Sequence, residues 1–266
     1  MDLQAYFERI NYTGDTAPTL DNLRQIHRAH LMAVPFENLN IHMPRRIILD
    51  EDRLFDKIVG ENRGGFCFEQ NGLFYAVLTQ LAFEVYRLEA NVLGATGDYG
   101  IPMSHMCLLV VIDGVRYLAD VGFGASFIEP IEIDNPAIQV QDVGQFKIEF
   151  DGDTLYYSCQ NIGQEEMRIG YRFYLTPHVL ADYESACHYH QTSPKSHFTQ
   201  KRVCSRWSHR GRVTVTDDQF IVTSWQGERT ETPITDEAQF HDLLAEHFGI
   251  TVQTLPPQQV KVAGGR

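Results

Sequence analysis

The chain has 266 residues, of which 43% are hydrophobic, so it can bury one large core or two to three smaller ones and is not a disordered chain. Its formal net charge of -13 opposes the general attraction to phosphates on which nucleic-acid binding depends, and we expect no nucleic-acid partner. Five cysteines without a close Cys-x-x-Cys pair suit a reducing compartment. Neither a signal-peptide pattern nor an apolar run of about 18 residues occurs, so we expect a cytoplasmic protein without a membrane span.

The first 85 or so residues are predicted to be helical, because apolar residues recur there at helical spacing, in segments 3–10, 20–26 and 54–58. A further helix is predicted from about Cys67 to Leu81, where the apolar residues form one stripe. The glycines at 64 and 65 interrupt the chain just before it. Cys67 is therefore expected at or near the start of a helix.

The middle of the chain, from about residue 85 to 159, changes to short β-prone runs. The predicted strands cover residues 85–93, 106–112, 115–121, 146–150 and 154–159. Asp113-Gly114 and Asp151-Gly152 are hairpin turn signals. The last third combines strands at 212–216 and 219–225 with an amphipathic helix at 236–248 that Gly249 ends, and the tail after Pro257 is predicted to be mobile.

Cys67 is the candidate nucleophile of the chain. A helix start offers unpaired backbone N–H groups and the positive end of the helix dipole, and both favour the thiolate, which is the reactive form of cysteine. The other interpretation is that Cys67 is a small buried hydrophobe, as most free cysteines are.

The Asp113-Gly114 turn predicts where His105 and Asp120 lie relative to each other. If the turn closes a two-residue hairpin loop, His105 and Asp120 are diagonal neighbours on one face of the hairpin, with Cα atoms about 7 to 8 Å apart. A carboxylate in so apolar a strand is costly unless it is paired. Taken singly, Asp120 also fits a structural carboxylate, and His105 also fits a surface or core histidine.

Cys67, His105 and Asp120 together are typical of a triad for acyl transfer. His105 would take the thiol proton, Asp120 would orient the imidazole, and backbone N–H groups near Cys67 would hold the oxyanion. A transglutaminase-like or papain-like cysteine hydrolase uses the same residue order, although the papain-type CGSCW signature is absent. A third class is a non-catalytic module with a metal at Cys187, His188 and His190, but their spacing matches no closed zinc signature, and we expect no metal site.

Four motifs carry a family resemblance. They are RGGFCFEQN at 63–71, VPFENL at 34–39, SHM at 104–106 and LADVGFG at 118–124. In this order and spacing the chain resembles the arylamine N-acetyltransferases, including the bacterial N-hydroxyarylamine O-acetyltransferases. It departs from the bacterial pattern at Gln70, where Leu or His is common, and we expect Gln70 to point away from the triad.

The resemblance implies an α+β fold with a papain-like core in three parts. These are a helical bundle with Cys67 (1–85), a β-barrel domain with His105 and Asp120 (86–190), and a C-terminal α/β lid (191–266). It implies the same triad and a ping-pong reaction of xenobiotic metabolism, in which acetyl-coenzyme A is a co-substrate and no cofactor is bound permanently. The acceptors would be aromatic amines, hydrazines and N-hydroxyarylamines. An amide synthase of the same family remains an alternative, as do a monomer and a homodimer.

Further residues are candidates for support and binding. Arg63 and Glu37 are expected to form an ion pair that braces the helix of Cys67, and Asn71 is a candidate for hydrogen bonds that support the site. The predicted coenzyme contacts are Phe123, Gly124, Lys195 and Lys201. The two lysines belong to a run from Lys195 to Arg212 that has six basic and no acidic residues. This basic run equally fits a solvated hairpin face. The predicted acceptor contacts are Phe36, Phe66 and Phe198, for which a core position is the alternative.

Overall fold

The computed structural model describes residues 1–43, 45–94 and 96–251. The tail after Pro257, for which mobility is predicted, lies outside the described residues. No helix within these described ranges is both long and apolar enough to cross a membrane.

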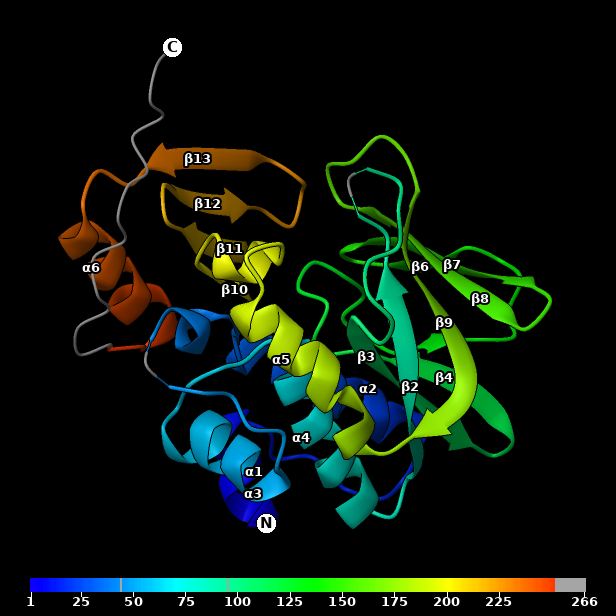
Figure 1. The fold of residues 1–266 in the computed structure, drawn as a ribbon. Coiled ribbons are helices and arrows are strands. Elements are labelled where there is room, and N and C mark those ends of the chain that lie inside the picture. The colour runs from blue at the N-terminus through cyan, green and yellow to red at the C-terminus, as the bar shows by residue number, and fades with distance from the viewer. Residues whose placement is uncertain (44, 95, 252–266) are drawn as a thin grey trace.

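Helices make up the first part of the chain, as predicted. They are α1 (Leu3–Arg9), α2 (Leu20–Ala33), α3 (Glu51–Phe55) and α4 (Cys67–Gln80), with 3-10 turn η1 (Leu39–His42) and π turn η2 (Asp56–Gly60) between them. Asp2, Thr19 and Asp50 cap the first three helices by accepting a backbone N–H with their side chains. In Figure 1, α4 lies near the centre of the molecule.

The middle of the chain forms an eight-stranded antiparallel sheet with the order β5-β4-β3-β2-β9-β8-β7-β6. Its strands are β2 (Glu84–Val92), β3 (His105–Ile112), β4 (Val115–Ala119), β5 (Ile131–Glu132), β6 (Gln139–Gln141), β7 (Gly144–Asp151), β8 (Thr154–Asn161) and β9 (Arg168–His178). The Gln139 side chain both donates to and accepts from the backbone of Glu132, at 2.8 Å each, so an amide links the two edge strands. The sheet is therefore barrel-like and nearly closed.

The C-terminal part adds a second sheet, in the order β1-β10-β11-β12-β13. Its elements are β1 (Phe36–Glu37), β10 (Val203–Ser208), β11 (Gly211–Thr216), β12 (Gln219–Thr223) and β13 (Arg229–Pro233), with η3 (Leu180–Tyr183), α5 (Glu184–Thr192) and η4 (His197–Thr199) before it and α6 (Glu237–Phe248) after it. Gly249 ends α6 in a left-handed conformation, φ 67°, as predicted. Because β1 belongs to the N-terminal part of the chain and the other four strands to the C-terminal part, this sheet joins the two parts.

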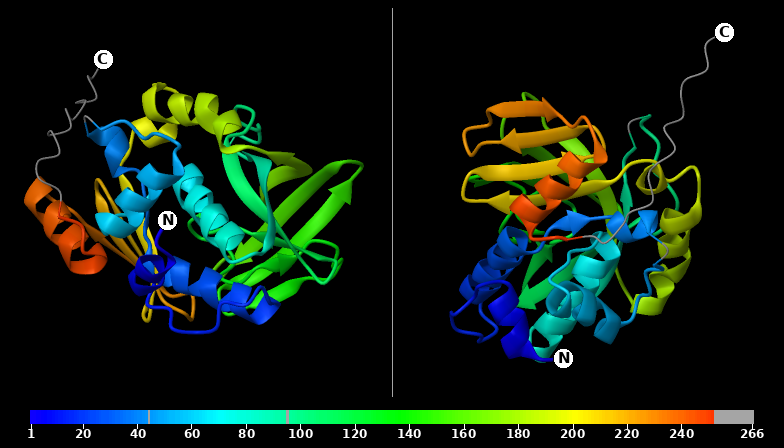
Figure 2. Two further views of the ribbon diagram at one scale, coloured as in Figure 1. Left: turned by 90° about the horizontal axis from the view of Figure 1, so that it is seen from below. Right: turned by 90° about the vertical axis from the view of Figure 1, so that its left-hand side faces the viewer.

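Three hydrophobic clusters hold these parts together. The largest lies between the helices and the eight-stranded sheet, the second lies under α6, and the third surrounds Cys67 and includes residues of α5. Figure 2 shows α5, in yellow-green, between the helical part and the barrel-like sheet. The predicted α+β class is confirmed, while the division at residues 85/86 and 190/191 stays a prediction.

Candidate active site

The nucleophile candidate sits where predicted, since Cys67 is the first residue of α4 and is buried. The Glu69 carboxylate accepts the N–H of Phe66 at 3.1 Å and so closes the first turn. Gln70 points away from the pocket, as expected, because its amide donates to the carbonyl of Gly65 at 2.8 Å and its Oε1 faces Nε2 of His30 at 3.2 Å. The loop that leads into α4 is therefore fixed by side chains of the helix itself.

A buried ionic network supports the same loop. The Arg63 guanidinium contacts Glu37 at 2.8 Å, which confirms the predicted ion pair, and Lys57 adds contacts to Glu69 at 2.7 Å and to Glu37 at 3.6 Å. Burial alone would raise the pKa of Glu37, but Lys57 and Arg63 hold it below its ordinary value. Glu37 is thus a charged anchor behind the Cys67 loop.

The hairpin of β3 and β4 places His105 and Asp120 together. Ile112 pairs with Val115, which confirms the two-residue loop, and the ladder continues to Leu108 and Ala119. His105 opens β3, and Asp120 follows the last residue of β4. Nε2 of His105 lies 2.6 Å from Oδ2 of Asp120, with both side chains buried.

Three further donors surround the Asp120 carboxylate. Asn71 donates to Oδ1 at 2.8 Å, the backbone N–H of Gly122 donates to the same oxygen at 2.9 Å, and the Tyr171 hydroxyl donates to Oδ2 at 3.1 Å. Burial would raise the pKa of Asp120, but the charge and hydrogen bond of His105, with Asn71 and Gly122, lower it. Asn71 also accepts the N–H of Val121 at 3.0 Å, so it supports the site as expected.

His105 stands between Asp120 and Cys67. Because Nε2 faces Asp120, Nδ1 is the ring nitrogen left for the thiol of Cys67, which lines the same pocket. Burial would lower the pKa of His105, but the charge and hydrogen bond of Asp120, followed by Cys67, raise it to about 10. The pairing with Asp120 therefore favours the protonated imidazole of His105.

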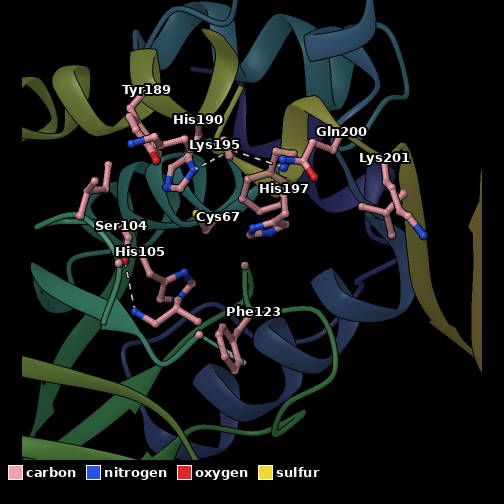
Figure 3. Close-up of a pocket in the computed structure, with 18 of the residues that line it drawn as sticks. Cys67, Ser104, His105, Phe123, Tyr189, His190, Lys195, His197, Gln200 and Lys201 are labelled. Carbon is pink, nitrogen blue, oxygen red and sulfur yellow. Dashed lines mark hydrogen bonds between the residues drawn. The ribbon is translucent and has the colours of Figure 1, made fainter. Parts of the chain in front are cut away.

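Cys67 and His105 open into a pocket of about 820 Å³. Figure 3 shows Cys67 at its centre, with His105 and Phe123 on one side and His197 and Lys201 on the other. Of the predicted contact residues, Phe36, Phe123, Lys195, Lys201 and Phe198 line this pocket. Aromatic side chains and two lysines in one pocket can accommodate an aromatic group and an anion.

Two predicted contact residues have other positions. The buried Phe66 ring packs edge-on against Phe68 and Phe198 at 5.2 and 5.8 Å, and so supports the pocket wall from behind. Gly124 has φ 73°, a left-handed conformation that explains a glycine without any ligand. Neither is among the described residues that line the pocket.

The basic run from Lys195 to Arg212 divides into exposed and engaged residues. Lys195 and Lys201 are exposed at the pocket, whereas Arg202 is buried between Asp217 and Glu237. Arg206 donates to the carbonyls of Ala33 and His247. The two lysines are therefore the cations of this run that are placed to meet an anionic ligand in the pocket.

The sequence interpretation missed three residues that shape the site. Nε2 of His27, on α2, accepts the backbone N–H of Asp120 at 3.1 Å, at the point where β4 ends. Tyr171 comes from β9, which was not predicted as a strand. A Cβ at Gly122 would lie 2.7 Å from Cα of Cys67, so only glycine fits there. The glycine of LADVG was a visible signal for this close approach, whereas nothing in the sequence linked His27 or Tyr171 to Asp120.

The alternative metal site gains no support. The Cys187 thiol accepts from the amide of Gln191 at 3.2 Å, and Nδ1 of His190 lies 3.2 Å from the Ser196 hydroxyl. Across residues 1–43, 45–94 and 96–251 no group of three or more His, Cys, Asp or Glu side chains is arranged to hold a metal ion.

Known proteins resemble the chain over most of its length. A family model described as N-acetyltransferase matches residues 19–256. The arylamine N-acetyltransferase of Escherichia coli (strain K12) is 32% identical over 94% of this chain and 89% of its own, and the arylamine N-acetyltransferase / N-hydroxyarylamine O-acetyltransferase of Salmonella typhimurium is 33% identical over the same shares. The solved arylamine N-acetyltransferase from Salmonella typhimurium superposes with a TM-score of 0.88 at 30% identity, covering 95% of this chain and 92% of that one. The Mycobacterium marinum arylamine N-acetyltransferase in complex with CoA gives 0.87 at 30% identity, covering 94% and 93%. The chain belongs to the arylamine N-acetyltransferase family.

Proposed function

We propose that the protein transfers the acetyl group of acetyl-coenzyme A to aromatic amines and hydrazines, with Cys67 as the acyl carrier. The observation that carries the proposal is the buried His105–Asp120 pair, 2.6 Å apart, beside a cysteine at the start of α4 and open to a large pocket. Full-length similarity to arylamine N-acetyltransferases, one of them in complex with CoA, supports the donor and the acceptor class. The same similarity favours transfer over hydrolysis of the papain type.

The proposed reaction uses the proton of the His105 imidazolium. The Cys67 thiolate attacks the thioester carbonyl, the bond from the carbonyl carbon to the coenzyme A sulfur breaks, and His105 gives its proton to that sulfur. The acceptor nitrogen then attacks acetyl-Cys67, His105 takes the proton of the amine, and the Cys67 sulfur leaves. Asp120 stays ionised throughout and keeps the imidazole oriented.

The pocket residues have separate roles in this proposal. Lys195 and Lys201 bind phosphates of coenzyme A, Phe123 contacts its pantetheine arm, and Phe36 and Phe198 contact the aromatic ring of the acceptor. The Salmonella relative is named as an N-hydroxyarylamine O-acetyltransferase as well, so hydroxylated amines are included among the acceptors. The described cysteines are all free, which supports a cytoplasmic location, and we propose a monomer or homodimer that acts on foreign aromatic amines.

Rapid mixing with acetyl-coenzyme A, followed by quenching and chromatography, tests the proposal. About one coenzyme A per active site should appear before any acceptor is added, and the intact mass should show one acetyl group. Cys67→Ala should abolish this burst. Cys187→Ala is the matched control, because Cys187 is buried in the same cluster as Cys67 and should leave the burst intact. A burst that survives in Cys67→Ala would refute the role of Cys67.

A further inference from the structure

Asn38 is a fully buried side chain that joins the VPFENL motif to the far wall of the pocket. Its two amide hydrogens go to the carbonyls of Phe198 at 3.0 Å and Lys201 at 2.8 Å, and its Oδ1 accepts the N–H of Val203 at 2.8 Å. One side chain therefore forms hydrogen bonds with three backbone groups of a segment about 160 positions later in the chain. No part of this arrangement belongs to the triad.

The segment that Asn38 holds, residues 196–203, is called here the wall segment. Seven of its eight residues line the pocket: Ser196, His197, Phe198, Gln200, Lys201, Arg202 and Val203. It consists of the short turn η4, an irregular stretch and the first residue of β10, so the carbonyls of Phe198 and Lys201 lack the regular partners of a long helix or a sheet. The Asn38 amide donates to the carbonyls of Phe198 and Lys201, and Nε2 of His42 also lies 2.8 Å from the Phe198 carbonyl.

The wall segment meets the surroundings of the nucleophile through Phe198, which packs against the hydrophobic cluster that contains Cys67. The Phe198 ring lies 5.8 Å from the ring of Phe66, the residue before Cys67, and 6.1 Å from the ring of Phe36. Figure 3 shows His197, Gln200 and Lys201 of the same segment across the pocket from His105, with Cys67 between them. The distance from the wall segment to His105 therefore sets how open the site is to water.

We propose that Asn38 is a positioning residue that keeps the wall segment closed over acetyl-Cys67, and thereby directs the acetyl group to an amine rather than to water. In the competing reaction, water attacks the acetyl carbonyl, His105 takes a proton of that water, the bond from carbon to the Cys67 sulfur breaks, and acetate leaves. The inference rests on the proposed function, because it concerns the fate of the acetyl-enzyme.

Two variants of Asn38 separate the contacts. Asn38→Ala removes all three hydrogen bonds, whereas Asn38→Asp keeps an acceptor for Val203 and loses both donors to the carbonyls. Asn22→Ala is the matched control, since Asn22 is also a buried asparagine, which donates to Asp15 at 3.1 Å and to the carbonyl of Ala17 at 2.9 Å before α2, away from the pocket.

The measurement is the ratio of acetyl-enzyme hydrolysis, followed without acceptor, to transfer onto an aromatic amine. Both Asn38 variants should raise this ratio about tenfold or more, while Asn22→Ala leaves it unchanged. Trypsin should also cut faster after Lys195 or Lys201, both exposed, in the Asn38 variants. A general loss of stability would slow both reactions together and would not change the ratio.

An unchanged ratio in folded Asn38 variants would overturn the inference, as would an equal rise in Asn22→Ala or a failure of both Asn38 variants to fold. If the unmodified protein forms no acetyl-enzyme, the proposed function fails instead. The trypsin comparison then still decides whether Asn38 holds the wall segment.

Discussion

Gly122 is the position where the strand that carries Asp120 passes closest to the nucleophile. A Cβ at Gly122 would lie 2.7 Å from Cα of Cys67, 2.7 Å from the amide nitrogen of Asn71 and 3.0 Å from the carbonyl oxygen of Cys67. Two of these three atoms are backbone atoms in the first turn of α4, so no flexible side chain can move aside. Gly122→Ala therefore perturbs the spacing between Cys67 and Asp120 directly.

The size of the effect follows from the distances. Carbon atoms in ordinary contact stand about 3.5 Å apart, so the start of α4 and the strand end must separate by about 0.8 Å to accept the Gly122→Ala methyl. A misplacement of about 1 Å in a reacting group costs about 100-fold in rate. Overpacking of this kind costs about 1–3 kcal/mol, which is less than the total stability of a typical domain. We expect a folded protein in which kcat/KM falls about 30- to 100-fold.

Single-turnover acetylation by acetyl-coenzyme A measures this loss without interference from acceptor binding. Gly60→Ala is the control, because a Cβ at Gly60 meets no atom within 4 Å and should leave the rate unchanged. Urea denaturation of both variants shows how much stability is lost. An acetylation rate near that of the unmodified protein in folded Gly122→Ala would refute the close approach of the strand end to Cys67.

Three other perturbations test the charges of the site. Asp120→Asn should keep the fold while kcat falls about 10³- to 10⁴-fold, because the imidazole loses its orientation, and near-normal turnover would remove Asp120 from the triad. Arg63→Ala leaves the buried Glu37 without its closest cation and should lower the free energy of unfolding by about 3 kcal/mol in urea titrations. A loss below about 1 kcal/mol would contradict the proposed brace. Burial lowers the pKa of His27 to about 4 and of His30 to about 3. Below about pH 6.5 the two histidines bind protons in the unfolded chain but not in the folded chain. The free energy of unfolding should therefore fall by about 2–3 kcal/mol per pH unit toward pH 4. A constant value from pH 7 to pH 5 would contradict two neutral buried histidines.

Local sequence patterns were sufficient to predict much of the fold and the placement of Cys67, His105 and Asp120 in the candidate site. The apolar stripe after Gly65 predicted α4 to within one residue, since the helix ends at Gln80 rather than Leu81. The Asp113-Gly114 turn predicted the hairpin register, because a two-residue loop leaves only one pairing of its strands. These features depend on neighbours in sequence.

Other elements escaped prediction because their signals were weak or their partners distant. Strand β9 alternates Ile169, Tyr171 and Phe173, but Gly170 and Pro177 interrupt the pattern, and both residues argue against a central strand. The end of β4 at Ala119, one residue before Asp120, was also not predicted, since the β-prone run was taken to continue to Val121. The N–H of Asp120 leaves the ladder there and bonds to His27, a partner 93 positions away.

The ionised state of Asp120 links these distant contacts to the chemistry of Cys67. A buried carboxylate would ordinarily take up a proton, but four donors, from His105, Asn71, Gly122 and Tyr171, face this one. Its charge raises the pKa of His105, the side chain that exchanges the proton in the proposed reaction. The charge of Asp120 is therefore held jointly by α4 and β9, through Asn71 and Tyr171, two residues that do not line the pocket in the described chain.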